Sequence, residues 1–413
     1  MSRTYETKLV NLAEVTLNIG LNLQKNQILH INADLDAAPF VRKVTEAAYK
    51  KGARHVYINW IDQETSKLKI LYALEESLTE FPEWSTKRSE ELIRQNAAFL
   101  SIRSPQPDAF SGLDPDRVGA VLKASALEMK QIASARKAGI IAFCIVCVPN
   151  EKWAGKVYPD HGPEEAQDML WKAVFDMTRV DCDDPIEQWQ RHIGSLLSKV
   201  DELNTMRFQK LHLEAPGTDL IVELPDRHLW VGGGATTQEG LFFTPNLPTE
   251  EVFTAPKRDG VNGTVRSTMP LVYGSTAIED ITLTFKDGKI IKMNASKGLE
   301  TLKRLIDSDE GSHYLGEIAL VPEDSPIAEE NTIFYNTLFD ENSSCHLAIG
   351  AAYPLCVEDG TNMTSEELSH AGLNMSITHV DFMIGSPKMN IDGIHWDGRR
   401  EPVFQNGCWV KKQ

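Results

Sequence analysis

The first half of the chain alternates between short apolar runs typical of strands and longer patterns typical of helices. Four runs predict strands, at residues 27–32, 55–60, 98–102 and 140–147. Helical periodicity lies between them, as at residues 5–19 and 40–48, and one further helix is expected over residues 114–137. Because strands that are joined by helices pair in parallel, this order predicts a doubly wound, mostly parallel α/β sheet.

The second half has a different texture, with short alternating runs separated by turns from Leu211 onward. Asp287-Gly288 lies between two strand-like runs and predicts a hairpin, and Asn406-Gly407 predicts another. A chain of 413 residues is long for a single core. We therefore expect an N-terminal α/β domain with bridging helices over residues 1–210. A β-rich α+β catalytic domain is expected over residues 211–413.

Composition excludes some classes of partner. The formal net charge of -17 argues against binding to a nucleic-acid backbone, which requires a basic surface. The N-terminal residues lack the apolar core of a signal peptide, and no apolar run reaches the length of a membrane span. Six scattered cysteines do not form a disulfide framework. These features together predict a cytoplasmic protein with reduced thiols and no membrane or nucleic-acid partner.

The residues that carry the most chemistry lie in the second half. His379 and Asp381 are two residues apart in an apolar stretch, so on a strand both side chains would point to the same face. His346 supplies a second imidazole, and Glu251 and Glu317 supply further carboxylates. Imidazoles and carboxylates together suit a hydrolytic site with one or two divalent metal ions.

A purely structural explanation competes with the metal site. Taken alone, His379-x-Asp381 is more simply a buried histidine that is hydrogen-bonded to a neighbouring aspartate. Glu317 makes that explanation harder, because a lone carboxylate in an apolar stretch is costly to bury without a cation or hydrogen-bond donors. The residues by themselves leave both explanations open.

Other motifs give weaker signals. Cys144-x-x-Cys147 lies within an apolar strand and is best explained as part of the core. Gly232-Gly233-Gly234 lacks the spacing of a phosphate-binding loop and predicts a tight turn. The chain contains no Gly-x-Ser-x-Gly motif, so a serine hydrolase has no support in the sequence.

Three long segments resemble the metal-dependent aminopeptidases of the AmpS, PepS and aminopeptidase T type. These segments are residues 245–256, 334–348 and 374–385, and the resemblance includes residues 81–84 in the first half. It therefore extends along the whole chain.

The resemblance implies a co-catalytic two-metal exopeptidase that removes N-terminal residues from peptides with a free N-terminus, and that forms a homodimer. The ligand positions of the family fall on Glu251, Glu317, His346, His379 and Asp381. A functional tyrosine of the family falls on Tyr353, and Glu341 is expected to act as a ligand or in proton transfer. The two divalent ions would be zinc, cobalt, manganese or magnesium.

Roles within this set are hypotheses. Glu317 is the first choice for the carboxylate closest to the attacking water, and Tyr353 for a hydrogen-bond donor to the oxyanion. Two other functions remain open: a different two-metal hydrolase that acts on esters or amides, and a non-catalytic protein that binds small ligands.

Overall fold

The computed structural model describes residues 3–273 and 276–411. The chain forms two compact units, each of which is described by itself. The first unit contains Met1–Arg191 and Gly234–Pro248, and the second contains His192–Gly233 and Thr249–Gln413. The predicted boundary between the domains after residue 210 stays a prediction.

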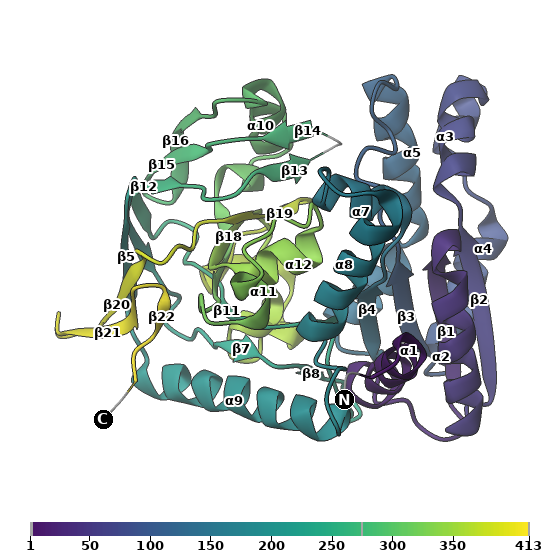
Figure 1. Cartoon of the computed structure of the whole chain (residues 1–413). Helices are drawn as coiled ribbons and strands as arrows, with labels where there is room; N and C mark the ends of the chain where they lie inside the picture. The colour runs from purple at the N-terminus through teal and green to yellow at the C-terminus, as the bar shows by residue number, and fades with distance from the viewer. Residues whose placement is uncertain (1–2, 274–275, 412–413) are drawn as a thin grey trace. The chain divides into compact units, whose positions relative to one another are not determined.

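The first unit is built on a parallel sheet with the strand order β10-β4-β3-β1-β2. Its strands are β1 (Ile28–Asp34), β2 (His55–Ile61), β3 (Ala98–Arg103), β4 (Phe143–Cys147) and β10 (Asn246–Leu247). Figure 1 shows β4, β3, β1 and β2 from left to right in this order. The chain adds β2 on one side of β1 and then β3 on the other side. This arrangement confirms the predicted doubly wound parallel sheet.

Helices connect these strands. They are α1 (Tyr5–Val15), α2 (Ala38–Lys50), α3 (Gln63–Tyr72), α4 (Glu83–Arg94), α5 (Pro115–Glu128), α6 (Lys130–Lys137), α7 (Glu151–Val157), α8 (Pro163–Met177) and, leading into the second unit, α9 (Pro185–Met206). The single helix that we expected over residues 114–137 is divided at Met129, whose ψ of -2° interrupts the regular backbone. No glycine or proline marks this break, so the residue pattern does not predict it. A small pair of strands, β8 (Ala235–Thr236) and β9 (Phe242–Phe243), completes the unit.

The second unit contains two larger sheets. The five-stranded sheet has the order β19-β18-β17-β11-β7 and the eight-stranded sheet has the order β16-β15-β12-β6-β5-β20-β21-β22. Their strands are β7 (Val231–Gly232), β11 (Val252–Thr254), β17 (Leu315–Leu320), β18 (His346–Gly350), β19 (His379–Met383), β5 (Lys210–Ala215), β6 (Thr218–Glu223), β12 (Val261–Arg266), β15 (Thr282–Lys286), β16 (Lys289–Asn294), β20 (Asn390–Ile394), β21 (Arg400–Gln405) and β22 (Cys408–Trp409). Both predicted hairpins, β15–β16 and β21–β22, are confirmed.

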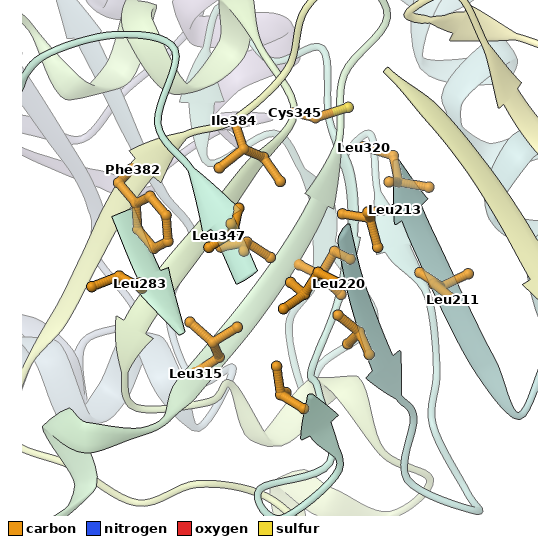
Figure 2. Packing of buried hydrophobic residues seen from close by; sticks show 14 of the residues in the cluster. Leu211, Leu213, Leu220, Leu283, Leu315, Leu320, Cys345, Leu347, Phe382 and Ile384 are labelled. Atoms are coloured by element: carbon orange, nitrogen blue, oxygen red, sulfur yellow. The ribbon is translucent and has the colours of Figure 1, made fainter. Parts of the chain in front are cut away.

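One apolar core joins these two sheets. Figure 2 shows Leu211, Leu213 and Leu220 of the eight-stranded sheet in the same cluster as Leu347 and Phe382 of the five-stranded sheet. All five side chains are buried. Because side chains alternate along a strand, the opposite face of the five-stranded sheet carries the neighbours of Leu347 and Phe382, which include the candidate ligands.

Short elements fill the remaining connections. They are β13 (Leu271–Tyr273), β14 (Thr276–Ile278), α10 (Leu299–Ile306), α11 (Pro326–Glu329), α12 (Thr337–Asp340) and α13 (Ser365–His370). Among the described residues, no helix is both long enough and apolar enough to cross a membrane.

Candidate metal centre

The register of β18 and β19 places four residues on one face of the five-stranded sheet. His346 and Ala348 alternate with the core residue Leu347, and Ala348 pairs directly with Asp381 of the next strand. His379 lies two residues before Asp381 and therefore points the same way. The sequence prediction that His379 and Asp381 share a face is thus met by the structure.

A bulge turns Glu317 toward the same face. The register between β17 and β18 shifts between Leu315 and Glu317, so Leu315 packs in the core while Glu317 pairs with Ala348. In an unbroken strand, these two residues would point to the same side. Gly316 permits the bulge, because a Cβ atom there would lie 2.2 Å from the carbonyl oxygen of Ala351. The bulge re-aims a carboxylate away from the core, which is a common use of such irregularities.

Glu251 approaches from the residue just before β11. Its neighbour Glu250 is also buried and takes the opposite direction, with its carboxylate 3.5 Å from the Nε2 atom of His192. The adjacent glutamates therefore contact different partners, as expected for an extended chain in which only one of them can face a given side. The backbone N–H of Glu250 donates to the side chain of Asn342 at 2.7 Å.

The candidate ligands form two groups of three that share one member. One group is Glu251, Glu317 and His346, and the other is Glu317, His379 and Asp381; in each, the potential ligand atoms lie within 4.8 Å of one another. The Nε2 atom of His346 is 3.2 Å from Glu251 and 3.5 Å from Glu317. The Nε2 atom of His379 is 3.4 Å from both Glu317 and Asp381. Glu317 therefore lies between the two imidazoles.

Backbone carbonyls orient both imidazoles. The Nδ1 atom of His346 lies 3.0 Å from the carbonyl oxygen of Ser344, and that of His379 lies 2.7 Å from the carbonyl oxygen of Ala351. Since a carbonyl oxygen only accepts hydrogen bonds, Nδ1 must carry the proton in each ring. The Nε2 lone pairs of the neutral rings are then free to bind a metal, in the arrangement that is usual for histidine ligands.

The electrostatics of the site show an excess of carboxylates. Burial by itself would lower the pKa of both imidazoles, but their contacts with carboxylates raise the pKa values of His346 and His379 well above the ordinary range. Burial would raise the pKa of Glu317, yet hydrogen bonds from the same imidazoles lower it to about 2. Burial and the charge on Glu317 raise the pKa of Glu251. Without metal ions, retained protons thus compensate the clustered negative charge, and metal binding would displace them.

Glu341 and Tyr353 border the two groups without belonging to either. Burial, followed by the charges of Asp381 and Glu251, raises the pKa of Glu341 well above its ordinary value. The Tyr353 ring lies 4.7 Å from the ring of His379. Burial and the nearby carboxylates raise the pKa of Tyr353 well above 10, so its phenol stays a neutral hydrogen-bond donor.

Sequence reasoning missed two polar residues that support this arrangement. Asn342 is fully buried and links the Glu250 backbone to the carbonyl oxygen of Leu338, directly beside Glu341. Asp309 accepts hydrogen bonds from the backbone N–H groups of Ser312 and Ile377 and fixes the approach to β19. The only available signal was their polarity, because the distant partners that they hold, the backbones of Glu250 and Ile377, are 92 and 68 residues away.

The residues present fit divalent metal ions. The donor atoms are imidazole nitrogens and carboxylate oxygens, which suit zinc, cobalt and manganese. The Oδ1 atom of Asp381 is buried without a hydrogen bond among the described residues, and its ion-pair contact at 3.4 Å is the Nε2 atom of His379, which would itself bind a metal. Ala348 lies in register between Glu317 and Asp381, and its small side chain leaves space between the two carboxylates.

Comparisons with known proteins agree with this assignment. Residues 5–409 match the family described as thermophilic metalloprotease (M29). Aminopeptidase 2 of Geobacillus stearothermophilus is 49% identical over 406 residues, which cover 98% of each chain. Aminopeptidase AmpS of Bacillus subtilis is 48% identical over 98% of this chain and 99% of its own.

A solved structure, wild-type AmpT from Thermus thermophilus, is similar to the whole fold. It superposes with a TM-score of 0.94 at 41% sequence identity, and the match covers 99% of this chain and 100% of that chain. The resemblance inferred from the three sequence segments is confirmed. The chain therefore belongs to the thermophilic metalloprotease family M29.

Proposed function

We propose that this metalloprotease is an aminopeptidase that holds two divalent ions and releases N-terminal residues from peptides. The observation that supports two ions most strongly is the sharing of Glu317 between two groups of three potential ligands. One ion would be held by Glu251, Glu317 and His346, and the other by Glu317, His379 and Asp381. Relatives at 48–49% identity carry the name aminopeptidase, which supports the exopeptidase activity.

Charge balance supports the same number of ions. Once bound ions displace the retained protons, Glu251, Glu317, Glu341 and Asp381 would together carry four negative charges and both imidazoles would be neutral. Two divalent cations would neutralise this set, whereas one would leave buried carboxylates uncompensated.

The residues around the ions would position the substrate and move protons. Bound divalent ions supply Lewis acidity and lower the pKa of a coordinated water toward neutrality. Glu341, which lies outside both ligand groups, would accept the proton of the attacking water and return it to the leaving amine. Tyr353 would donate a hydrogen bond to the developing oxyanion. Glu317 would serve as the shared ligand, and its contacts with both imidazoles leave it less suited to proton transfer.

Hydrolysis of a leucyl or arginyl chromogenic amide tests this proposal. We expect cleavage of the unblocked amide, loss of activity on chelation and recovery when zinc or cobalt is added back. The N-acetylated amide should not be cleaved, because its α-amine is no longer available. Equal cleavage of both amides would instead support another two-metal hydrolase, and no cleavage with metal bound would support a binding protein.

The homodimer and the cytoplasmic location are further proposals. The first rests on the family resemblance and the second on composition. Light scattering coupled to size-exclusion chromatography tests the dimer directly, since a mass near 46.1 kDa would show a monomer.

A further inference from the structure

The parallel sheet of the first unit has one face whose polarity rises toward the carboxyl ends of the strands. The opposite face of its central strand, β1, is entirely apolar and fully buried (Leu29, Ile31 and Ala33). The unusual face begins with Ile28, which packs in an apolar cluster with Leu92 of α4 and Ile132 of α6. It continues with His30, Asn32 and Asp34, and the buried carboxylate of Asp34 is paired with Arg103 at 3.4 Å. A parallel sheet that is covered by helices normally keeps both faces apolar, so these residues require an explanation.

A row of polar side chains crosses this face. Asn32 on β1 pairs in register with Asn59 on β2 and with Ser101 on β3. The Nδ2 atom of Asn59 donates to the Oδ1 atom of Asn32 at 2.8 Å. All three residues are partly accessible. The row therefore forms a polar floor at the edge of the apolar cluster.

Two arginines reach this floor from the helices that cover it. Arg88 of α4 donates to the Oδ1 atom of Asn59 at 3.4 Å, and Arg136 of α6 donates to the Oγ atom of Ser101 at 3.5 Å. These long contacts are their only side-chain hydrogen bonds among the described residues, and the Nε atom of each is buried without a partner. Most of their donors are thus unused.

Neither arginine is neutralised by a carboxylate. In the described ranges, no Asp or Glu oxygen lies within 4.0 Å of the guanidinium of Arg88 or Arg136. Each instead lies over an aromatic ring, Arg88 over Trp84 at 5.4 Å and Arg136 over Phe143 at 4.7 Å. In a chain with 59 acidic residues and a net charge of -17, two uncompensated, half-buried arginines on one surface are an exception.

His30 lies beside both arginines and has an unused ring nitrogen. It is only 5% exposed, and its Nε2 atom is buried without a hydrogen-bond partner in the described part of the chain. Burial, followed by the charges of Arg88 and Arg136, lowers the pKa of His30 to about 4. The ring is therefore neutral at pH 7, and the two guanidiniums repel any proton that would charge it.

The topology places this cluster where open α/β sheets bind ligands. The chain leaves β1 toward β2 on one side and later returns to β3 on the other, so the order of strands reverses at β1. Ligands of doubly wound sheets bind at such a reversal, beyond the carboxyl ends of the strands. Asn32 and Ser101 lie two residues before the ends of β1 and β3.

We propose that Arg88, Arg136 and His30, with the floor of Asn32, Asn59 and Ser101, bind a small oxyanion of the carboxylate or phosphate type. The planar forks of two guanidiniums match the oxygen atoms of such an anion, and the amide and hydroxyl groups of the floor complete its hydrogen bonds. Bound charge would compensate the two arginines in the way that metal ions compensate the carboxylates of the second unit. This site is separate in sequence and in chemistry from the candidate metal centre.

The test uses the imidazole of His30 as a local reporter in the metal-loaded protein. We would label histidines with ¹⁵N, assign the His30 signal with His30→Gln, and titrate with inorganic phosphate and, separately, with acetate. A saturable shift of the His30 signal and a rise in its pKa are expected, since the anion offsets the guanidinium charges. A response to one anion only identifies the type of oxyanion.

Variants show whether the arginines carry the binding. We expect Arg88→Met combined with Arg136→Met to raise the Kd at least tenfold. Arg94→Met is the matched control, because Arg94 lies on the same helix but is exposed and paired with Glu91; its affinity should be unchanged. If the double variant does not fold, Arg88→Lys and Arg136→Lys are measured instead. We expect each to bind the anion severalfold more weakly, because lysine lacks the planar fork of the guanidinium.

Three results would overturn the proposal. The first is a His30 signal that neither anion moves at tens of millimolar. The second is an unchanged affinity in the double methionine variant, and the third is an unchanged affinity in both lysine variants. Phosphate held at the metal centre would not imitate a positive result, because the readout is confined to His30 and its dependence on the two arginines.

Discussion

The two units each contain a cluster of polar side chains on a sheet face, and the two clusters have opposite charge. In the second unit, Glu251, Glu317 and Asp381 surround two imidazoles that their charges hold in the protonated state when no metal is bound. In the first unit, two arginines lie beside His30, and burial, followed by their charges, lowers the pKa of this imidazole to about 4. The pKa of histidine is thus raised in the second unit and lowered in the first.

This difference shows that the uncompensated charge of a site without ligand indicates the charge of the ligand. Buried charges are expensive unless a partner compensates them. A surplus of carboxylates therefore indicates a cation, and a surplus of guanidiniums indicates an anion. Burial lowers the pKa of both kinds of histidine, and the neighbouring charges then raise it beside carboxylates or lower it further beside guanidiniums.

The largest expected effect comes from breaking the carboxylate cluster at its shared member. Glu317→Gln removes the ligand that both groups have in common. Loss of both ions should reduce kcat/KM by about a thousandfold or more. Metal content by inductively coupled plasma mass spectrometry and hydrolysis of the leucyl amide check this prediction. Glu323→Gln, which changes another partly buried glutamate outside the site, is the control.

Tyr353→Phe removes a hydrogen-bond donor from the same site without changing the charge of the site. The variant keeps every proposed ligand but lacks the phenol that would donate to the oxyanion. We expect kcat to fall about a hundredfold with metal content unchanged, which is typical for loss of one oxyanion donor. Tyr314→Phe is the control, because Tyr314 is a buried tyrosine that packs against Arg258 instead. Equal kcat for the Tyr353 variant and the wild type would remove Tyr353 from the mechanism.

Asn342→Ala tests whether metal binding by the carboxylates depends on the hydrogen bonds of the uncharged Asn342 side chain. The substitution leaves the N–H of Glu250 and the carbonyl oxygen of Leu338 without their partner. Metal affinity should fall about tenfold, the lower end of what outer partners of metal ligands contribute. Competition with a fluorescent chelator measures this affinity. Asn262→Ala, which removes a similar backbone contact at an exposed hairpin, should bind metal normally.

The smallest expected effect is the pH dependence of the stability that His30 contributes in the first unit. Because the folded-state pKa of His30 is about 4 and the ordinary value is 6.5, the unfolded chain binds more protons between these values. The contribution of His30 to stability is therefore constant above about pH 6.5 and decreases as the pH falls toward 4, by about 3 kcal/mol at most. Urea unfolding of wild type and His30→Gln between pH 4 and 7 measures the difference. If the free energies of unfolding of the two proteins changed in parallel with pH, His30 would not take up a proton on unfolding, and the prediction would be wrong.

Much of the fold follows from local pattern, and so does part of the site. Alternating helices and strands predict the parallel sheet, and Asp287-Gly288 predicts its hairpin, because these features depend on neighbouring residues. His379 and Asp381 are close in sequence, so the strand period alone places them on one face.

Features that depend on distant contacts were not predictable in this way. The bulge at Gly316 reverses the direction of Glu317 and becomes evident only when the carbonyl of Ala351 is in place. The pairing of Arg88 and Arg136 over one floor requires the packing of α4 and α6 on the sheet. The family resemblance, rather than spacing, connected Glu251 with His346.

The number of divalent ions per chain tests the central claim most directly. Native mass spectrometry of the purified protein, with and without added zinc or cobalt, resolves each bound ion. Two ions per chain in the wild type, and none in Glu317→Gln, are the predicted result. A single ion in the wild type, or two ions retained by the Glu317 variant, would contradict a site in which Glu317 joins two metal positions.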